Sequence, residues 1–92
     1  MNDFRFAVSP QATASIHDGG IVILHLGSGN FYTCNGTGAR IWHAIEQKLS
    51  LDAIAKEIST AYEITLASAR QHTDRFLAEL ESHALVQYEV AL

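Results

Sequence analysis

A change in the spacing of apolar residues between Gly29 and Trp42 constrains the fold of this chain more than any other feature. Up to Cys34 the apolar residues occur in short runs that are typical of β-strands. From Thr37 onward they recur at intervals of three and four residues, which is the spacing of an amphipathic helix. The segment is therefore predicted to be a strand that runs directly into a helix, with a sheet before it and a helical bundle after it.

The residues between this strand and this helix favour a sharp junction. Asn35 and Thr37 can each cap the first helical turn with a side-chain oxygen, and Gly36 and Gly38 allow the backbone to turn. The helix fixes the C-terminal end of the strand. If the outer edge of the strand is unpaired, its row of free N–H and C=O groups is a template for another chain.

The first half of the chain predicts a three-stranded antiparallel meander. We expect strands at Ala12–His17, Ile21–Leu26 and Asn30–Cys34, and the second of these is the richest in β-branched residues. The Asp-Gly-Gly turn at 18–20 and the Gly-Ser-Gly turn at 27–29 are short enough to join antiparallel neighbours.

The second half predicts three helices. The first runs over Thr37–Lys48, the second follows an N-cap at Ser50 with Asp52 in its first turn, and the third runs from a cap at Thr65 to about His83. Three strands followed by three helices give an α+β fold in which a sheet lies against one side of a bundle.

Each predicted helix has one apolar face. Trp42 is the largest apolar side chain and is expected to seal the sheet against the bundle. The residues on the three faces are Ile41, Trp42, Ile45 and Leu49; then Leu51, Ile54, Ala55, Ile58 and Tyr62; then Leu66, Ala69, Thr73, Phe76, Leu77, Leu80 and Ala84.

The 92 residues are expected to form one domain, because single cores rarely split below this length. Residues 1–11 have no clear apolar period and contain the only proline, Pro10, so they are interpreted as an N-terminal lead-in or tail. The domain is assigned to residues 12–92. Within it, residues 85–90 alternate between apolar and polar, which suits a short edge strand or an extended tail.

Charge and hydropathy argue against nucleic-acid and membrane partners. The net charge is -4, whereas binding to a phosphate backbone needs clustered cations. The longest apolar run, Ile21–Leu26, is far shorter than the roughly 20 residues of a membrane span, and the N-terminus has no signal-peptide pattern. The single cysteine, Cys34, excludes an internal disulfide and agrees with a cytoplasmic location.

The sequence shows no pattern of a metal, cofactor or catalytic site. The five histidines are scattered, and none forms an i, i+4 pair on a helix, so no metal site is expected. The glycine-rich stretches at 27–29 and 35–38 lack the Lys-Ser or Lys-Thr of a phosphate-binding loop, so no cofactor is expected either. An enzyme that uses Cys34 is one alternative, but no base or oxyanion hole accompanies this thiol.

Four stretches together resemble the PqqD family, over roughly Val8–Tyr88. They are Gly20 with the following Ile-Val-Ile-Leu, Gly29-Asn30-Phe31-Tyr32, Asn35 leading into Thr37-Gly38-Ala39-Arg40-Ile41-Trp42, and Phe76-Leu77-Ala78-Glu79-Leu80. Members of this family are the elements that recognise the precursors of ribosomally made, post-translationally modified peptides.

The resemblance implies a compact winged helix-turn-helix fold without catalytic activity. The leader of a precursor peptide is then taken up as an extra strand on the third strand, in the groove beside the third helix, which is β-augmentation. A free-standing protein of this kind is most similar to those of lasso-peptide pathways. The implied partners are a precursor leader peptide and a leader protease or other maturation enzyme.

The resemblance also gives the groove residues by position. The predicted peptide-binding residues are Asn30, Phe31, Tyr32, Thr33 and Cys34 on the third strand, and Ala69, Arg70, Thr73, Asp74 and Leu77 on the third helix. For Phe31, Tyr32 and Leu77 simple core packing is an equal alternative. Arg70 and Asp74 are four residues apart and can pair with each other instead.

Two positions depart from the family pattern. Cys34 stands where an aliphatic residue is usual, and His72 stands where an acidic residue is often found, four positions before Phe76. If the acidic residue normally meets the peptide, His72 changes the leader preference and makes binding sensitive to pH near about 6 to 7. The alternative for His72 is an exposed helix residue without a role.

A DNA-binding winged helix is the alternative function, because this topology can place the third helix in a major groove. Arg70 and Arg75 are accompanied on that helix by Asp74, Glu79 and Glu81, which repel phosphates. Peptide binding is therefore the favoured function.

Overall fold

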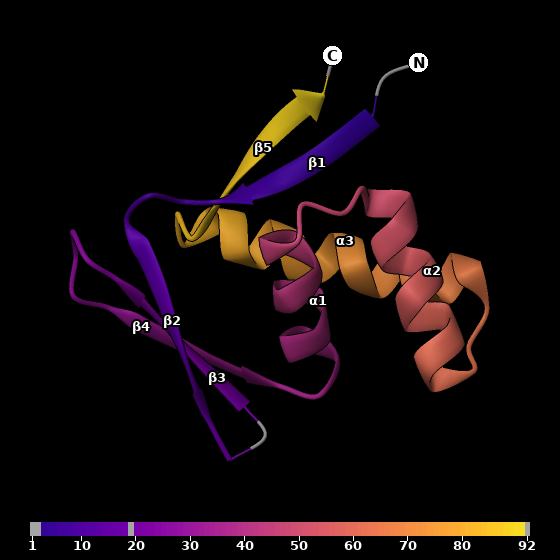
Figure 1. Cartoon of the computed structure of the whole chain (residues 1–92), viewed down its shortest axis with the longest axis horizontal. Coiled ribbons are helices and arrows are strands. Elements are labelled where there is room, and N and C mark those ends of the chain that lie inside the picture. Colours follow the sequence, from indigo (N-terminus) through magenta and orange to yellow (C-terminus); the bar gives the residue numbers. More distant parts are fainter. Residues whose placement is uncertain (1–2, 19, 92) are drawn as a thin grey trace.

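The computed structural model describes residues 3–18 and 20–91, which form two antiparallel sheets and three helices. In chain order the elements are β1 (Asp3–Val8), β2 (Ala12–His17), β3 (Gly20–His25), β4 (Phe31–Asn35), α1 (Thr37–Glu46), α2 (Leu51–Tyr62), α3 (Leu66–Ser82) and β5 (Val86–Ala91). The larger sheet has the strand order β2-β3-β4, and the smaller one pairs β1 with β5. In Figure 1 the larger sheet lies to one side of the helices and the β1–β5 ribbon projects away from it.

The predicted α+β fold and its antiparallel meander are confirmed. The turn between β3 and β4 contains a bulge: the His25 N–H donates to the Asn30 carbonyl (2.8 Å), and the Gly29 N–H donates to the His25 carbonyl (2.8 Å). Gly29 has φ 76°, a left-handed conformation that glycine adopts without steric strain. The bulge sets the register, in which Ile23 lies opposite Tyr32.

The N-terminal segment differs from the prediction of a tail. Asp3–Val8 forms β1, which pairs antiparallel with β5 so that Asp3 lies opposite Ala91. Phe6 is buried, and its ring meets that of Tyr88 edge-on with centroids 5.0 Å apart. The partner strand lies at the other end of the chain, so no local pattern reveals this pairing. The strand predicted as one possibility for residues 85–90 is confirmed as β5.

The apolar core lies between the larger sheet, the helices and the inner end of the ribbon. Trp42 is 1% exposed, which confirms its predicted place in the core. The buried apolar residues are Phe6, Ile21, Ile23, Ile41, Trp42, Ala44, Ile45, Leu51, Ile54, Ala55, Ile58, Ala69, Leu77, Leu80, Leu85 and Val86.

Three residues predicted on the buried helix faces are exposed instead. Tyr62 ends α2 and is 40% exposed, with the Arg40 guanidinium 5.8 Å from its ring centroid. Leu66 is 50% exposed because it begins α3, beyond the reach of the core. Ala84 has φ 58° and follows the end of α3, so it leaves the helical face.

Side-chain caps are confirmed at the starts of α2 and α3. The Ser50 hydroxyl accepts a hydrogen bond from the Ala53 N–H (3.2 Å). The Thr65 hydroxyl accepts one from the Ser68 N–H (3.1 Å). Each cap satisfies a backbone donor that has no partner within its helix.

Helix α1 differs from the prediction at both ends. Its N-cap is Gly36 (φ 53°, ψ −122°), which has no side chain, so the cap position is held by neither Asn35 nor Thr37. At the other end α1 stops at Glu46 rather than at Lys48. The φ of Lys48 is 61°, a value that an α-helix cannot include.

Candidate functional site

Strand β4 is an edge of the larger sheet, because it pairs with β3 on one side only. The hydrogen bond from the His25 N–H to the Asn30 carbonyl shows that these two residues face each other as a hydrogen-bonded pair. Along an antiparallel ladder, hydrogen-bonded residue pairs alternate with pairs that share no hydrogen bond. Tyr32 and Cys34 therefore direct their backbone groups toward β3, whereas Phe31 and Thr33 direct theirs away from it. Among the described strands none pairs with this outer edge, since β5 pairs with β1.

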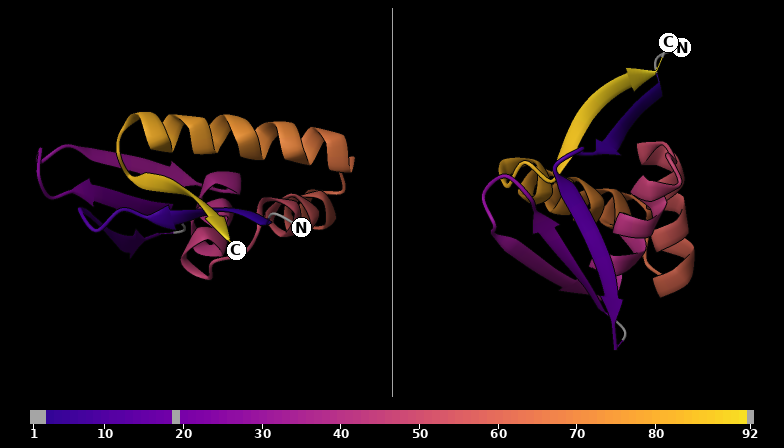
Figure 2. Two further views of the ribbon diagram at one scale, coloured as in Figure 1. Left: turned by 90° about the horizontal axis from the view of Figure 1, so that it is seen from above. Right: turned by 60° about the vertical axis from the view of Figure 1, so that its left-hand side comes forward.

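Helix α3 runs along the same side of the molecule as this edge. The Tyr32 ring of β4 meets two α3-side rings, with its centroid 6.4 Å from that of Phe76 and 5.5 Å from that of His83. Seen from above in Figure 2, the long helix passes beside the strand that leads into α1. The free edge of β4 and the neighbouring face of α3 together make a cleft, which we call the β4–α3 cleft.

The β4–α3 cleft has a hollow at each end. The hollow at the start of β4, of about 350 Å³, is lined by His25, Ser28, Gly29, Asn30, Phe31, Tyr32, His83 and Leu85. The hollow at the end of β4, of about 210 Å³, is lined by Thr37, Gly38, Ile41, His72, Arg75, Phe76 and Glu79. The two lie on either side of the Tyr32 contact, so an extended segment along β4 would pass from one to the other.

Tyr32 links the two walls of the cleft. Burial raises the pKa of its phenol to about 12, and a hydrogen bond to the Glu79 carboxylate together with the charge of that group adds to the rise. The phenol therefore keeps its proton at neutral pH and can donate a hydrogen bond to the Glu79 carboxylate. This contact ties β4 to α3 across the middle of the cleft.

We expect Tyr32 to make the fold less stable in alkali. Its pKa is about 12 in the folded chain against an ordinary 10.0, so the folded state holds the proton more tightly than the unfolded state does. That stabilisation is complete below pH 10 and is lost as the pH rises through about 12. The free energy of unfolding can be measured with urea at about pH 8 and at about pH 11. Between these two values it should fall less for Tyr32→Phe than for the wild type. An equal fall in the two proteins would contradict the raised pKa of Tyr32 in the folded chain.

Cys34 is half-buried on β4 and its thiol is free. Burial raises the pKa of this thiol above its ordinary value, so the thiol is protonated at neutral pH. A protonated thiol is a weak nucleophile. The environment therefore disfavours the enzyme alternative that depends on Cys34.

The five strand residues predicted to bind peptide lie together. They are Asn30, Phe31, Tyr32, Thr33 and Cys34, which form β4 and the turn that precedes it. Tyr32 and Cys34 point to the helix side of the sheet with Ile23 and Ile21, their partners on β3. Phe31 points to the opposite face and is 70% exposed. Peptide contact at these positions stays a prediction.

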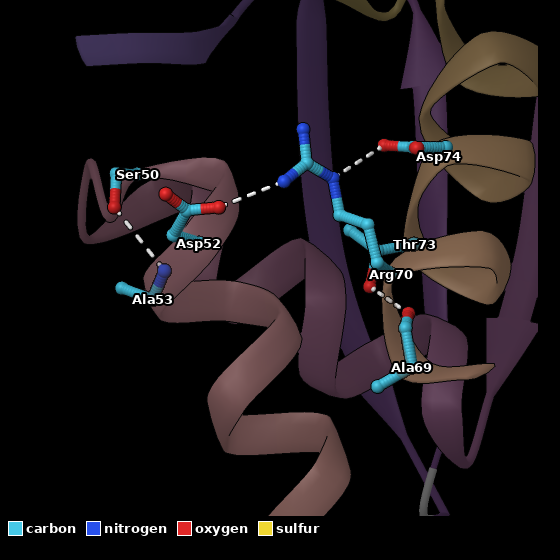
Figure 3. Close-up of polar contacts among 7 residues, drawn as sticks. All are labelled: Ser50, Asp52, Ala53, Ala69, Arg70, Thr73 and Asp74. Carbon is cyan, nitrogen blue, oxygen red and sulfur yellow. Dashed lines mark hydrogen bonds and ion pairs between the residues drawn. The ribbon is translucent and has the colours of Figure 1, made fainter. Parts of the chain in front are cut away.

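The five helix residues predicted for the other wall lie away from β4. Ala69, Thr73 and Leu77 are buried in the core, and the Thr73 hydroxyl donates to the Ala69 carbonyl (2.8 Å). Arg70 turns toward α2, where its guanidinium pairs with Asp52 (2.7 Å) and also with Asp74 (3.1 Å), as Figure 3 shows. The pairing of Arg70 with Asp74, given as the alternative, is confirmed. These five side chains face α2, the core or solvent, because the stripe chosen from the sequence is the one that packs the bundle.

A second stripe on α3 faces the cleft. It consists of His72, Arg75, Phe76 and Glu79, and His83 continues it at the helix end. Sequence reasoning singled out His72 but assigned Phe76 to the core. The signal that could have found this stripe is its own spacing of three and four residues, which is masked by its mixed polar and aromatic composition.

The described residues hold no group of three or more His, Cys, Asp or Glu side chains placed to bind a metal ion. None of the helices within 3–18 and 20–91 combines the length and the hydropathy that crossing a bilayer requires.

Comparison with family models finds a match to the family described as coenzyme PQQ synthesis protein D (PqqD), over residues 20–86. The chain belongs to the PqqD family. The match spans β3, β4 and all three helices, so it includes both walls of the β4–α3 cleft in this PqqD-family chain. Comparison with curated proteins finds no match.

Two solved structures share the fold of this PqqD-family chain. One is TbiB1 in complex with the TbiA(beta) leader peptide, with a TM-score of 0.84 and 23% identity over 88% of this chain and 94% of that one. The other is a lasso peptide synthetase B1 complexed with the leader peptide, with a TM-score of 0.84 and 22% identity over 90% and 98% of the two chains. The predicted fold and family are thereby confirmed.

Proposed function

We propose that this chain is a non-catalytic adaptor that binds the leader of a precursor peptide in the biosynthesis of a ribosomally made, post-translationally modified peptide. The observation that carries the proposal is the unpaired outer edge of β4 beside α3. Both solved structures of the same fold hold a leader peptide. The name of one of them, a lasso peptide synthetase B1, supports a lasso-peptide pathway as the setting.

The proposed binding mode is strand addition to β4. The outward N–H and C=O groups of Phe31 and Thr33 supply main-chain hydrogen bonds, and the two hollows receive side chains of the peptide. We expect a dissociation constant of about 1 μM or tighter, which corresponds to about −8 kcal/mol. The bound peptide would then pass to a leader protease or another maturation enzyme.

The remaining parts of the proposal concern catalysis, DNA binding and location in the cell. The raised pKa of Cys34 supports a role without covalent catalysis. Helix α3 carries three carboxylates, from Asp74, Glu79 and Glu81, against two guanidinium groups, and the guanidinium of Arg70 is already paired, which supports peptide over DNA as the ligand. We place the adaptor in the cytoplasm, because its single cysteine is unpaired.

Nuclear magnetic resonance titration of the labelled chain tests the proposal. The probe is a synthetic leader from a precursor-like peptide encoded beside the gene, and the TbiA(beta) leader peptide serves as a second probe. Amide signals of Asn30–Cys34 and of the cleft side of α3 should shift. Shifts confined to other elements would overturn the binding mode, and salt-dependent retention on DNA would favour the DNA-binding alternative.

A further inference from the structure

The hollow at the end of β4 contains a cation that nothing in the described chain neutralises. The Arg75 guanidinium lines this hollow and makes no hydrogen bond or ion pair with any described residue. The other α3 arginine, Arg70, is held by Asp52 and Asp74 on the far side of the helix.

The one carboxylate in this hollow is already engaged. Glu79 lies beside the Tyr32 phenol, whose pKa it helps to raise, and no ion pair joins it to Arg75. The first turn of α1, which supplies Thr37 and Gly38 to the hollow, carries no acidic residue. The remaining polar side chains of this hollow are Thr37 and His72, neither of which is an anion. Arg75 therefore has no ion-pair partner among the described residues.

We infer that Arg75 selects an acidic side chain, Asp or Glu, in the peptide that adds to β4. This inference rests on the proposed function, and it names a chemical requirement on the ligand. A guanidinium presents parallel N–H donors that match the two oxygens of a carboxylate. A strand paired with Phe31–Asn35 spans about 13 Å, so a peptide of about ten residues reaches from β4 into the hollow at its end.

Selection from a displayed library of random peptides of about ten residues tests the inference without a known ligand. The wild type should select peptides with Asp or Glu at one position. Arg75→Glu should select Lys or Arg at that same position and leave the rest of the consensus unchanged. Arg40→Ala is the matched control, because it removes an exposed arginine that contacts Tyr62 and lines neither hollow, so it should leave the consensus unaltered.

Affinities of a selected peptide sharpen the test. Replacing its acidic residue with the matching amide should weaken binding to the wild type about five- to tenfold and leave binding to Arg75→Ala unchanged. Two results would overturn the inference while peptide binding itself stands. One is that Arg75→Glu selects the same consensus as the wild type. The other is that the wild type and Arg75→Ala lose the same affinity when the acidic residue of the peptide is replaced by its amide. Failure of every variant, including the wild type, to select any peptide would overturn the proposed function and the inference with it. Circular dichroism of each variant confirms that it is folded.

Discussion

Thr33→Pro is expected to weaken peptide binding about a hundredfold while leaving the fold in place. The N–H of Thr33 points away from β3, so proline removes a donor that the sheet itself does not use. The added peptide loses one main-chain hydrogen bond, keeps an unpaired carbonyl and meets the proline ring. Together these effects correspond to about 3 kcal/mol. Isothermal titration calorimetry with the leader peptide measures the change.

Ala14→Pro is the matched control for Thr33→Pro. Strand β2 is the other edge of the same sheet, and the N–H of Ala14 points outward because Thr13 and Ser15 are the residues that bond to β3. The two variants thus make the same chemical change on opposite edges of one sheet. Equal binding by both variants would rule out β4 as the edge that takes the peptide.

Trp42→Ala is expected to lower the free energy of unfolding by about 3 to 5 kcal/mol. The indole is 1% exposed and lies at the centre of the core, so its removal leaves a cavity that the surrounding residues fill only in part. A small domain has a total stability of about 5 to 15 kcal/mol, so the variant should be close to unfolding. Urea denaturation followed by circular dichroism measures the loss.

Two further variants test the reason for this loss. The Trp42 Nε1–H is buried and has no hydrogen-bond partner among the described residues, so Trp42→Phe should lose much less stability than Trp42→Ala because it also removes this unpaired donor. Tyr62→Ala is the surface control and should change stability by about 1 kcal/mol or less, because Tyr62 is exposed and contacts Arg40 only loosely. A Tyr62→Ala loss as large as that of Trp42→Ala would contradict the placement of the core.

Local features of the sequence were sufficient to predict the meander, the strand that leads into α1, and the caps at Ser50 and Thr65. Each of these depends on residues within a few positions of one another. The pairing of β1 with β5 was missed because it joins segments at opposite ends of the chain, and the single proline made residues 1–11 look irregular.

The strand residues predicted for the site lie along the free edge of β4, whereas the predicted helix residues lie on the faces of α3 that pack the core or face α2 or solvent; peptide contact stays a prediction for both sets. The strand positions follow from one edge, which the meander defines. On α3 two stripes of similar spacing compete, and the more apolar one, with Ala69 and Leu77, packs the bundle. Residues such as Arg75 and Glu79 look like an ordinary solvated surface until the position of β4 beside them is known.

Gly38 shows how closely the backbone of α1 approaches both walls of the cleft. A Cβ atom at this position would stand 3.1 Å from the Cβ of Cys34 and 3.1 Å from two ring carbons of Phe76. A methyl group at residue 38 would therefore press on β4 and on α3 at once, and each contact would need its neighbour to give way by a few tenths of an ångström. The spacing between the two walls that receive a visiting peptide is thus coupled to the size of residue 38.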